Sequence, residues 1–188
     1  KLPNVPTSIF TVMSKMASEY GALNLSQGFP NFESDPVLIE VVSKAMKDGF
    51  NQYAPMQGDL GLRERISEKV QTLYGKKYNP TNEITVTAGA TQAIFTAIAA
   101  TIQKGDEVIV FAPAYDCYEP AIKLFGGVTK AIQLKPPFYT PNWDEVAQAI
   151  TANTKMIIIN TPHNPSGMVF SEKDMLQLQE LAERHDLL

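Results

Sequence analysis

The stretch from 156 to 167, Met-Ile-Ile-Ile-Asn-Thr-Pro-His-Asn-Pro-Ser-Gly, holds the residues best suited to bind a ligand. Its β-branched run predicts a buried strand, which ends in a polar loop containing Asn160 and Asn164. Pro162 and Pro165 bias the residues before them toward extended backbone, so Asn164 lies between rigid neighbours. Ligands of open α/β sheets bind at the carboxyl ends of strands, which makes Asn164 a candidate ligand contact. The alternative is an ordinary strand-to-helix turn with an Asx-type hydrogen bond.

A second candidate is an Ala-Gly-Ala-Thr segment around Gly89, between a short strand expected at 84–87 and a helix expected at 92–102. Gly89 allows the backbone to approach a ligand closely, and the first N–H groups of a helix face outward at its positive end. The segment therefore predicts a phosphate cradle made by Gly89, Ala90 and Thr91. It matches neither the Walker loop nor the Gly-x-Gly-x-x-Gly dinucleotide fingerprint. A plain helix start made of small residues is the alternative.

Three further residues lie in loops where a ligand contact and a structural role are both open. Tyr115 follows the strongly apolar strand expected at 107–111, where its ring could stack on a flat heterocycle or pack against its own loop. Tyr53 lies in a loop rich in Gly, Pro and Asn, where its phenol could bind phosphate or fill a surface cleft. Gly28 could offer its backbone N–H to a carboxylate, although turns of this type are common.

The elements that must position these residues alternate between strands and helices from residue 83 onward. Strands are expected at 84–87, 107–111, 128–134 and 155–160, and helices at 9–20, 36–47, 62–74, 92–102, 121–124, 144–150 and 172–185. This alternation predicts an α/β fold with a mostly parallel sheet covered by helices. We expect Ser171 to cap the last helix and His185 to interact with the dipole at its end.

Length and composition indicate a globular chain and argue against several classes of protein. The 188 residues suffice for one domain, or for one domain and part of another. A hydrophobic content of 44% with 19% charged residues is typical of globular proteins. The net charge of −4 argues against nucleic acid as a partner, and the apolar runs are too short to span a membrane. The first residues form no apolar signal region, so secretion is not expected from them. Cys117 as the single cysteine fits a reducing cytoplasm, and the scattered histidines predict no metal site.

The candidate residues Gly28, Tyr53, Gly89, Tyr115 and Asn164, in this order and at these separations, resemble those of the class I/II (fold type I) pyridoxal-phosphate aminotransferases. The resemblance covers essentially the whole chain. The segments that look most like the methionine/kynurenine/glutamine branch, and most like its bacterial methionine aminotransferases, are 24–30, 51–53, 116–120 and 160–165. The resemblance implies transfer of an amino group from an L-amino acid to a 2-oxo acid, with a methionine, aromatic or kynurenine-like donor.

The resemblance also implies a role for each candidate that would bind the cofactor, pyridoxal 5'-phosphate. The segment from Gly89 to Thr91 would hold its phosphate, Tyr115 would stack on its pyridine ring, and Asn164 would bind the 3-hydroxyl oxygen of that ring and help to orient the substrate. Tyr53 would reach the phosphate bound by a neighbouring subunit, which implies a homodimer.

For the substrate, the resemblance implies that Gly28 binds the α-carboxylate and that Phe10 lines the side-chain pocket. The family's Schiff-base lysine, its ring-nitrogen aspartate and its carboxylate-binding arginine are expected beyond Leu188, so no catalytic residue is assigned within this segment. We therefore expect the N-terminal half of an enzyme, inactive by itself.

The expected domains are an N-terminal arm with a small-domain segment at 1–35 and the first half of the large cofactor-binding domain at 36–188. Two other functions stay open: a carbon–sulfur β-lyase that uses the same cofactor, and a catalytically inactive homologue that acts as a binding module.

Overall fold

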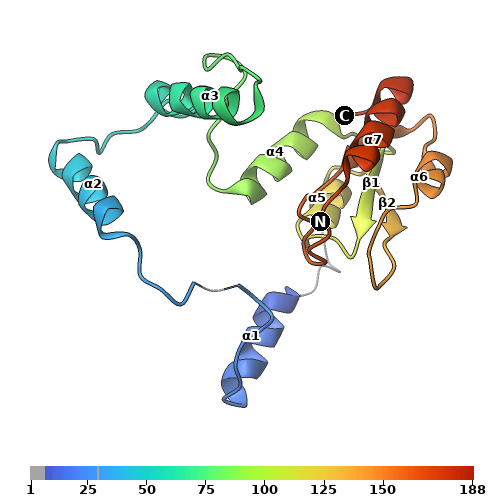
Figure 1. Ribbon diagram of the computed structural model, residues 1–188, viewed down its shortest axis with the longest axis horizontal. Coiled ribbons are helices and arrows are strands. Elements are labelled where there is room, and N and C mark those ends of the chain that lie inside the picture. Colours follow the sequence, from blue (N-terminus) through green and yellow to red (C-terminus); the bar gives the residue numbers. More distant parts are fainter. Residues whose placement is uncertain (1–6, 29) are drawn as a thin grey trace. The chain divides into compact units, whose positions relative to one another are not determined.

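The computed structural model describes residues 7–28 and 30–188, which divide into two units, Thr7–Ala88 and Gly89–Leu188. Figure 1 shows their helices and strands. The domain boundary expected near residue 35 stays a prediction.

The unit Thr7–Ala88 contains the three helices expected in this part of the chain. They are α1 (Ile9–Glu19), α2 (Pro36–Lys47) and α3 (Leu60–Tyr74). Asp35 caps α2 by accepting the Val37 N–H at 2.8 Å, and Pro36 occupies the first helical position as predicted. The helix α3 starts earlier than expected, at Leu60, because the Asp59 side chain accepts a backbone N–H of its first turn.

Buried polar side chains attach α3 to the segments on either side of it. The Arg63 side chain is buried and donates to the carbonyl oxygens of Gly58 at 3.1 Å and Thr81 at 3.3 Å. Ser67 is also buried and donates to the carbonyl oxygen of Tyr78 at 2.5 Å. These hydrogen bonds satisfy the buried donors and hold the segment against the helix.

The strand expected at 84–87 does not form. Val86 donates its backbone N–H to the carbonyl oxygen of Gln57 at 2.9 Å, but among the described residues no strand pairs with this segment. The prediction of a strand is therefore wrong here, because a strand requires a neighbour that takes up its N–H and C=O groups as well as an alternating apolar pattern.

The unit Gly89–Leu188 is built on a parallel sheet, as the alternation of elements predicted. Its strands are β1 (Glu107–Ala112), β2 (Val128–Gln133) and β3 (Thr154–Ile158), in the spatial order β2-β1-β3. Glu107 is paired with Val128 on one side and with Thr154 on the other, and both pairings are parallel. All three carboxyl ends therefore lie at the same edge of the sheet.

Helices cover both faces of this sheet. They are α4 (Ala90–Thr101), α5 (Tyr118–Leu124), α6 (Trp143–Ala149) and α7 (Glu172–His185). Successive side chains of β1 point to opposite faces, so Val108 and Val110 pack with residues of α4 and α5. Ile109 and Phe111 pack with residues of α6 and α7. The expectation of a helix-covered parallel sheet is confirmed.

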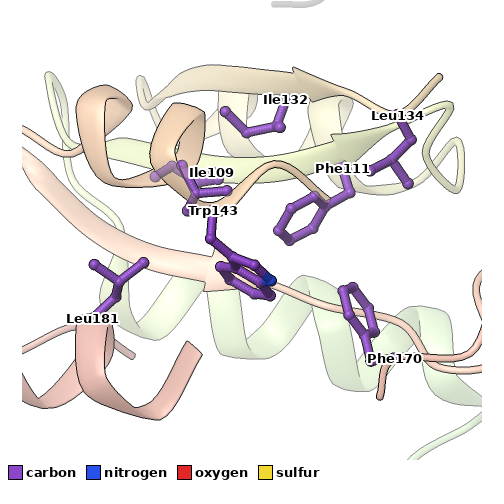
Figure 2. Packing of buried hydrophobic residues seen from close by; sticks show 8 residues of the cluster. Ile109, Phe111, Ile132, Leu134, Trp143, Phe170 and Leu181 are labelled. Atoms are coloured by element: carbon purple, nitrogen blue, oxygen red, sulfur yellow. The ribbon is translucent and has the colours of Figure 1, made fainter. Parts of the chain in front are cut away.

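Aromatic rings fill the core on the side of α6 and α7 (Figure 2). The Phe111 ring lies edge-on to Trp143, with 6.1 Å between centroids, and edge-on to Phe170, with 5.7 Å. Such arrangements are favoured by the charge distribution of aromatic rings. The Trp143 Nε1 donates to Asp174 Oδ1 at 2.8 Å, which links α6 to the start of α7.

The last helix has the ends that its sequence predicted. Ser171 and Asp174 form a capping box, and His185 lies in the final turn, where a cation would interact favourably with the helix dipole. In residues 7–28 and 30–188, none of the helices combines the length and apolar character needed to cross a membrane.

Candidate functional site

A cavity of about 390 Å³ lies in the unit Gly89–Leu188, where the start of α4 meets the loops that follow β1 and β3. Its lining residues come from all three segments: Ala90, Thr91, Ile94, Tyr115, Tyr118, Asn160, Pro162 and Asn164. The loops leave the carboxyl ends of adjacent parallel strands, which is where α/β sheets bind their ligands. The structure thus brings Ala90, Thr91, Tyr115 and Asn164 together, as the sequence suggested.

The start of α4 provides backbone N–H groups at this cavity. Gly89 is the N-cap, with φ +88° and ψ 165°, a backbone conformation that is essentially restricted to glycine. A Cβ built on Gly89 would meet no atom within 4 Å, so conformation and not crowding requires glycine there. Ala90 and Thr91 begin the helix, where N–H groups have no intrahelical acceptor. This end of α4 is suited to hold an anion.

Two tyrosines form the aromatic wall of the cavity. Tyr115 is half-buried and lies edge-on to Tyr118, with ring centroids 5.9 Å apart. Tyr115 therefore packs within its own segment and also lines the cavity, and its stacking on a ligand ring stays a prediction. Burial, together with the nearby Cys117 and Tyr115, raises the pKa of the Tyr118 phenol, which stays neutral near neutral pH.

The loop after β3 presents two carboxamide side chains to the cavity. Asn160 Oδ1 accepts the backbone N–H of Asn164 at 2.6 Å, so this region contains the expected side-chain-to-backbone turn. Asn164 itself is exposed and lines the cavity, and its side-chain amide forms no hydrogen bond with the described part of the chain. The amide is therefore available to a ligand.

The three other predicted site residues belong to the unit Thr7–Ala88. Tyr53 is fully exposed in that unit, and Gly28 is exposed with open space around its Cα. Phe10 is half-buried in α1 and donates its backbone N–H to Ser8 Oγ at 3.3 Å. Their roles in the site stay predictions.

Several lining residues were not assigned from the sequence, namely Ile94, Tyr118, Asn160 and Pro162. A signal existed for Ile94, because it follows Thr91 by three positions and so lies on the same face of α4. Asn160 carried a signal in its motif, but its bond to Asn164 depends on the three-dimensional path of the loop.

Comparisons with known proteins agree with this arrangement. The family Aminotransferase class I and II matches residues 20–188. The methionine aminotransferase of Escherichia coli (strain K12) is 46% identical over 187 residues, an alignment that covers 100% of this chain and 48% of that protein. Human kynurenine–oxoglutarate transaminase 1 is 35% identical, and the alignment covers 93% of this chain and 44% of that protein.

The similar solved structures are also aminotransferases. The crystal structure of YbdL from Escherichia coli, for which a methionine aminotransferase function was identified, matches this chain with a TM-score of 0.95 at 45% identity. The alignment covers 100% of this chain and 49% of YbdL. N-Succinyldiaminopimelate aminotransferase from Mycobacterium tuberculosis has a TM-score of 0.94 at 34% identity, with the same coverage. The chain spans about half the length of the curated relatives that it matches.

Proposed function

This chain belongs to the aminotransferase class I and II family, and on that basis we propose that the whole protein transfers an amino group from an L-amino acid to a 2-oxo acid with pyridoxal 5'-phosphate as cofactor. The observation that carries the proposal is the cavity of the unit Gly89–Leu188. There a helix N-terminus, an aromatic wall and a carboxamide that has no hydrogen-bond partner in the described part of the chain converge at one sheet edge.

The described residues fit the chemical parts of this cofactor. A phosphate group suits the start of α4, where Gly89 leaves open space and the N–H groups of Ala90 and Thr91 face outward. A flat heteroaromatic ring suits the wall formed by Tyr115. A phenolic oxygen suits the carboxamide of Asn164, whose N–H can donate to it.

When bound, pyridoxal phosphate supplies an electron sink for the electron pair released from the Cα–H bond of an amino acid. The chain's own residues fix its orientation. The start of α4 would hold the phosphate, Tyr115 would cover one face of the ring and exclude water from it, and Asn164 would keep a donor at the phenolic oxygen. Restricting rotation in this way lowers the entropic cost of reaching the reactive geometry.

For the donor we propose methionine first, together with aromatic and kynurenine-like amino acids. The names of the E. coli and human relatives support this range, and so does Phe10 if it lines the side-chain pocket. An apolar wall favours such side chains by roughly 0.8 kcal/mol per buried CH₂. Since one methylene group changes selection by only about 10- to 200-fold, a broad donor profile is expected.

We also place Tyr53 in the site of a partner subunit, which makes the functional unit a homodimer. Its full exposure within the unit Thr7–Ala88 leaves the phenol available for such a contact. The single cysteine, Cys117, supports a reducing compartment such as the cytoplasm.

The cofactor assignment is tested on the full-length protein by its visible absorption. Bound pyridoxal phosphate should give a band that borohydride removes and that weakens in the Asn164→Ala variant. A colourless protein that gains no band on addition of pyridoxal phosphate would refute the proposal. With a sulfur-bearing donor, release of thiol and ammonia without amino-group transfer would favour a carbon–sulfur lyase instead.

A further inference from the structure

Asn160 lies just beyond the end of β3 and is half-buried at the edge of the cavity. Its Oδ1 accepts the backbone N–H of Asn164 at 2.6 Å, across a span of four residues. Within the described chain this is the hydrogen bond that ties the peptide group of Asn164 to the strand. The carboxamide of Asn160 thus sets where the Asn164 backbone lies relative to the sheet.

The rest of the loop is closed by other contacts. His163 is buried, donates its backbone N–H to the Met168 carbonyl at 2.7 Å and accepts the Gly167 N–H at 2.7 Å. Its Nδ1 lies 2.8 Å from Ser166 Oγ. Because these contacts do not involve Asn160, we expect the turn to survive removal of the Asn160 carboxamide. The Gly167 N–H still holds the peptide group that joins His163 to Asn164, so removal of the Asn160 carboxamide should loosen the attachment of this turn, with Asn164 in it, to the end of β3.

We infer that Asn160 is a positioning residue that acts through Asn164 and directs the Asn164 side chain toward the cofactor. The inference rests on the proposed function, in which Asn164 donates to the phenolic oxygen of pyridoxal phosphate. When the turn is less firmly attached to the sheet, the Asn164 side chain samples more positions, so forming its hydrogen bond to the cofactor costs more conformational entropy. Removal of the Asn160 carboxamide should therefore weaken cofactor binding, and this effect should vanish when the Asn164 amide is absent.

A double-mutant cycle on the full-length protein tests this. The equilibrium dissociation constant for pyridoxal phosphate is measured by absorbance titration of the apoprotein, for Asn160→Ala, Asn164→Ala and the double variant. Asn160→Ala should weaken binding by about 3- to 10-fold, the range that corresponds to one net hydrogen bond. In the Asn164→Ala background, the same change should have less than a twofold effect, because residues that act through one another are not additive.

Two further variants separate positioning from general damage. Asn160→Asp keeps an acceptor oxygen at the same position and should recover most of the lost affinity. Asn142→Ala is the matched control, since Asn142 Oδ1 also accepts backbone N–H groups, those of Asp144 and Glu145 at the start of α6. It should lower the melting temperature of the apoprotein and leave the dissociation constant unchanged.

The outcomes distinguish the inference from the proposed function. If Asn164→Ala does not weaken cofactor binding, the proposed site is wrong and the inference falls with it. If Asn164→Ala weakens binding but Asn160→Ala does not, or if the two effects add, the site stands and the positioning role is refuted. A full effect of Asn160→Ala that disappears in the Asn164→Ala background establishes the positioning role.

Discussion

Replacing Gly89 with alanine separates backbone conformation from side-chain contact at the start of α4. Gly89 has φ +88° and ψ 165°, and a Cβ at this position would meet no atom within 4 Å. The added methyl group therefore collides with nothing outside its own backbone. The strain energy of the Gly89→Ala variant therefore comes entirely from a backbone conformation that residues other than glycine rarely adopt.

Such a conformation costs about 1–3 kcal/mol for a residue that carries a Cβ. Because the space around Gly89 is open, the chain can relieve this strain by changing φ and ψ at the N-cap. That change would turn the N–H groups of Ala90 and Thr91 away from a bound phosphate. Loss of one hydrogen bond to a charged group costs about 1.5–3 kcal/mol, or about 10- to 160-fold in the dissociation constant for pyridoxal phosphate.

The assay is a cofactor titration of the full-length apoprotein, combined with thermal unfolding of the same sample. Gly105→Ala is the matched control, because Gly105 also has a positive φ, +94°, and open space around its Cα. Gly105 lies in the turn before β1 and does not line the cavity. Both variants should lose stability, but only Gly89→Ala should weaken cofactor binding.

Equal losses of stability in the two variants, with the dissociation constant of Gly89→Ala within about twofold of the parent, would refute the reasoning. The start of α4 would then be an ordinary helix start made of small residues.

Four further predictions test other parts of the molecule. If Tyr53 completes a partner's site, mixing an inactive Tyr53→Phe protein with an inactive Schiff-base-lysine variant should restore partial activity, and no recovery despite proven subunit exchange would place Tyr53 elsewhere. A donor screen on the full-length protein should favour methionine, phenylalanine and kynurenine, whereas a strong preference for aspartate would contradict the donor assignment. The pKa of Glu107 is lowered from 4.5, chiefly by a hydrogen bond from Thr151, so its carboxylate stabilises the fold above that pH and the contribution is lost as the pH falls through the lowered pKa. Glu107→Gln should therefore lower the urea midpoint at about pH 7, and this loss should shrink as the pH is lowered below the usual glutamate range, whereas a loss that does not change with pH would refute this. Thr129 Oγ1 is buried and has no hydrogen-bond partner among the described residues, so Thr129→Val should raise the free energy of unfolding by about 1 kcal/mol, and a loss of stability would show that the hydroxyl group is satisfied.

Local patterns in the sequence were enough to determine most of the elements and their type. The apolar run from Glu107 to Ala112 forms a buried strand, and Asp35 followed by Pro36 begins a helix. These features depend on neighbours within a few residues, such as a cap or a side-chain alternation. The parallel sheet was predictable from the alternation of strands and helices. Each connecting helix brings the chain back to the edge of the sheet where the previous strand began, so the next strand runs parallel to it.

The sequence also predicts a chemistry for the site, because glycine at a helix start, tyrosine and asparagine each suit only a few kinds of ligand group, and these roles stay predictions. A glycine before a helix, a tyrosine after a buried strand and an asparagine between prolines indicated phosphate, ring and polar oxygen in turn. Their order matched a known family, which the comparisons confirmed.

Only the tertiary structure decided which of these residues meet. Ala90, Tyr115 and Asn164 line one cavity because the loops after β1 and β3 leave adjacent strands at the same edge as the start of α4. The contact of Asn160 with Asn164 and the inclusion of Tyr118 depend on that same packing. The segment at 84–87 has the sequence pattern of a strand but does not form one. A strand needs a pairing partner that is distant in the sequence, and the described chain does not supply one for this segment. Long-range neighbours are set by how strands align and helices pack, which no local pattern specifies.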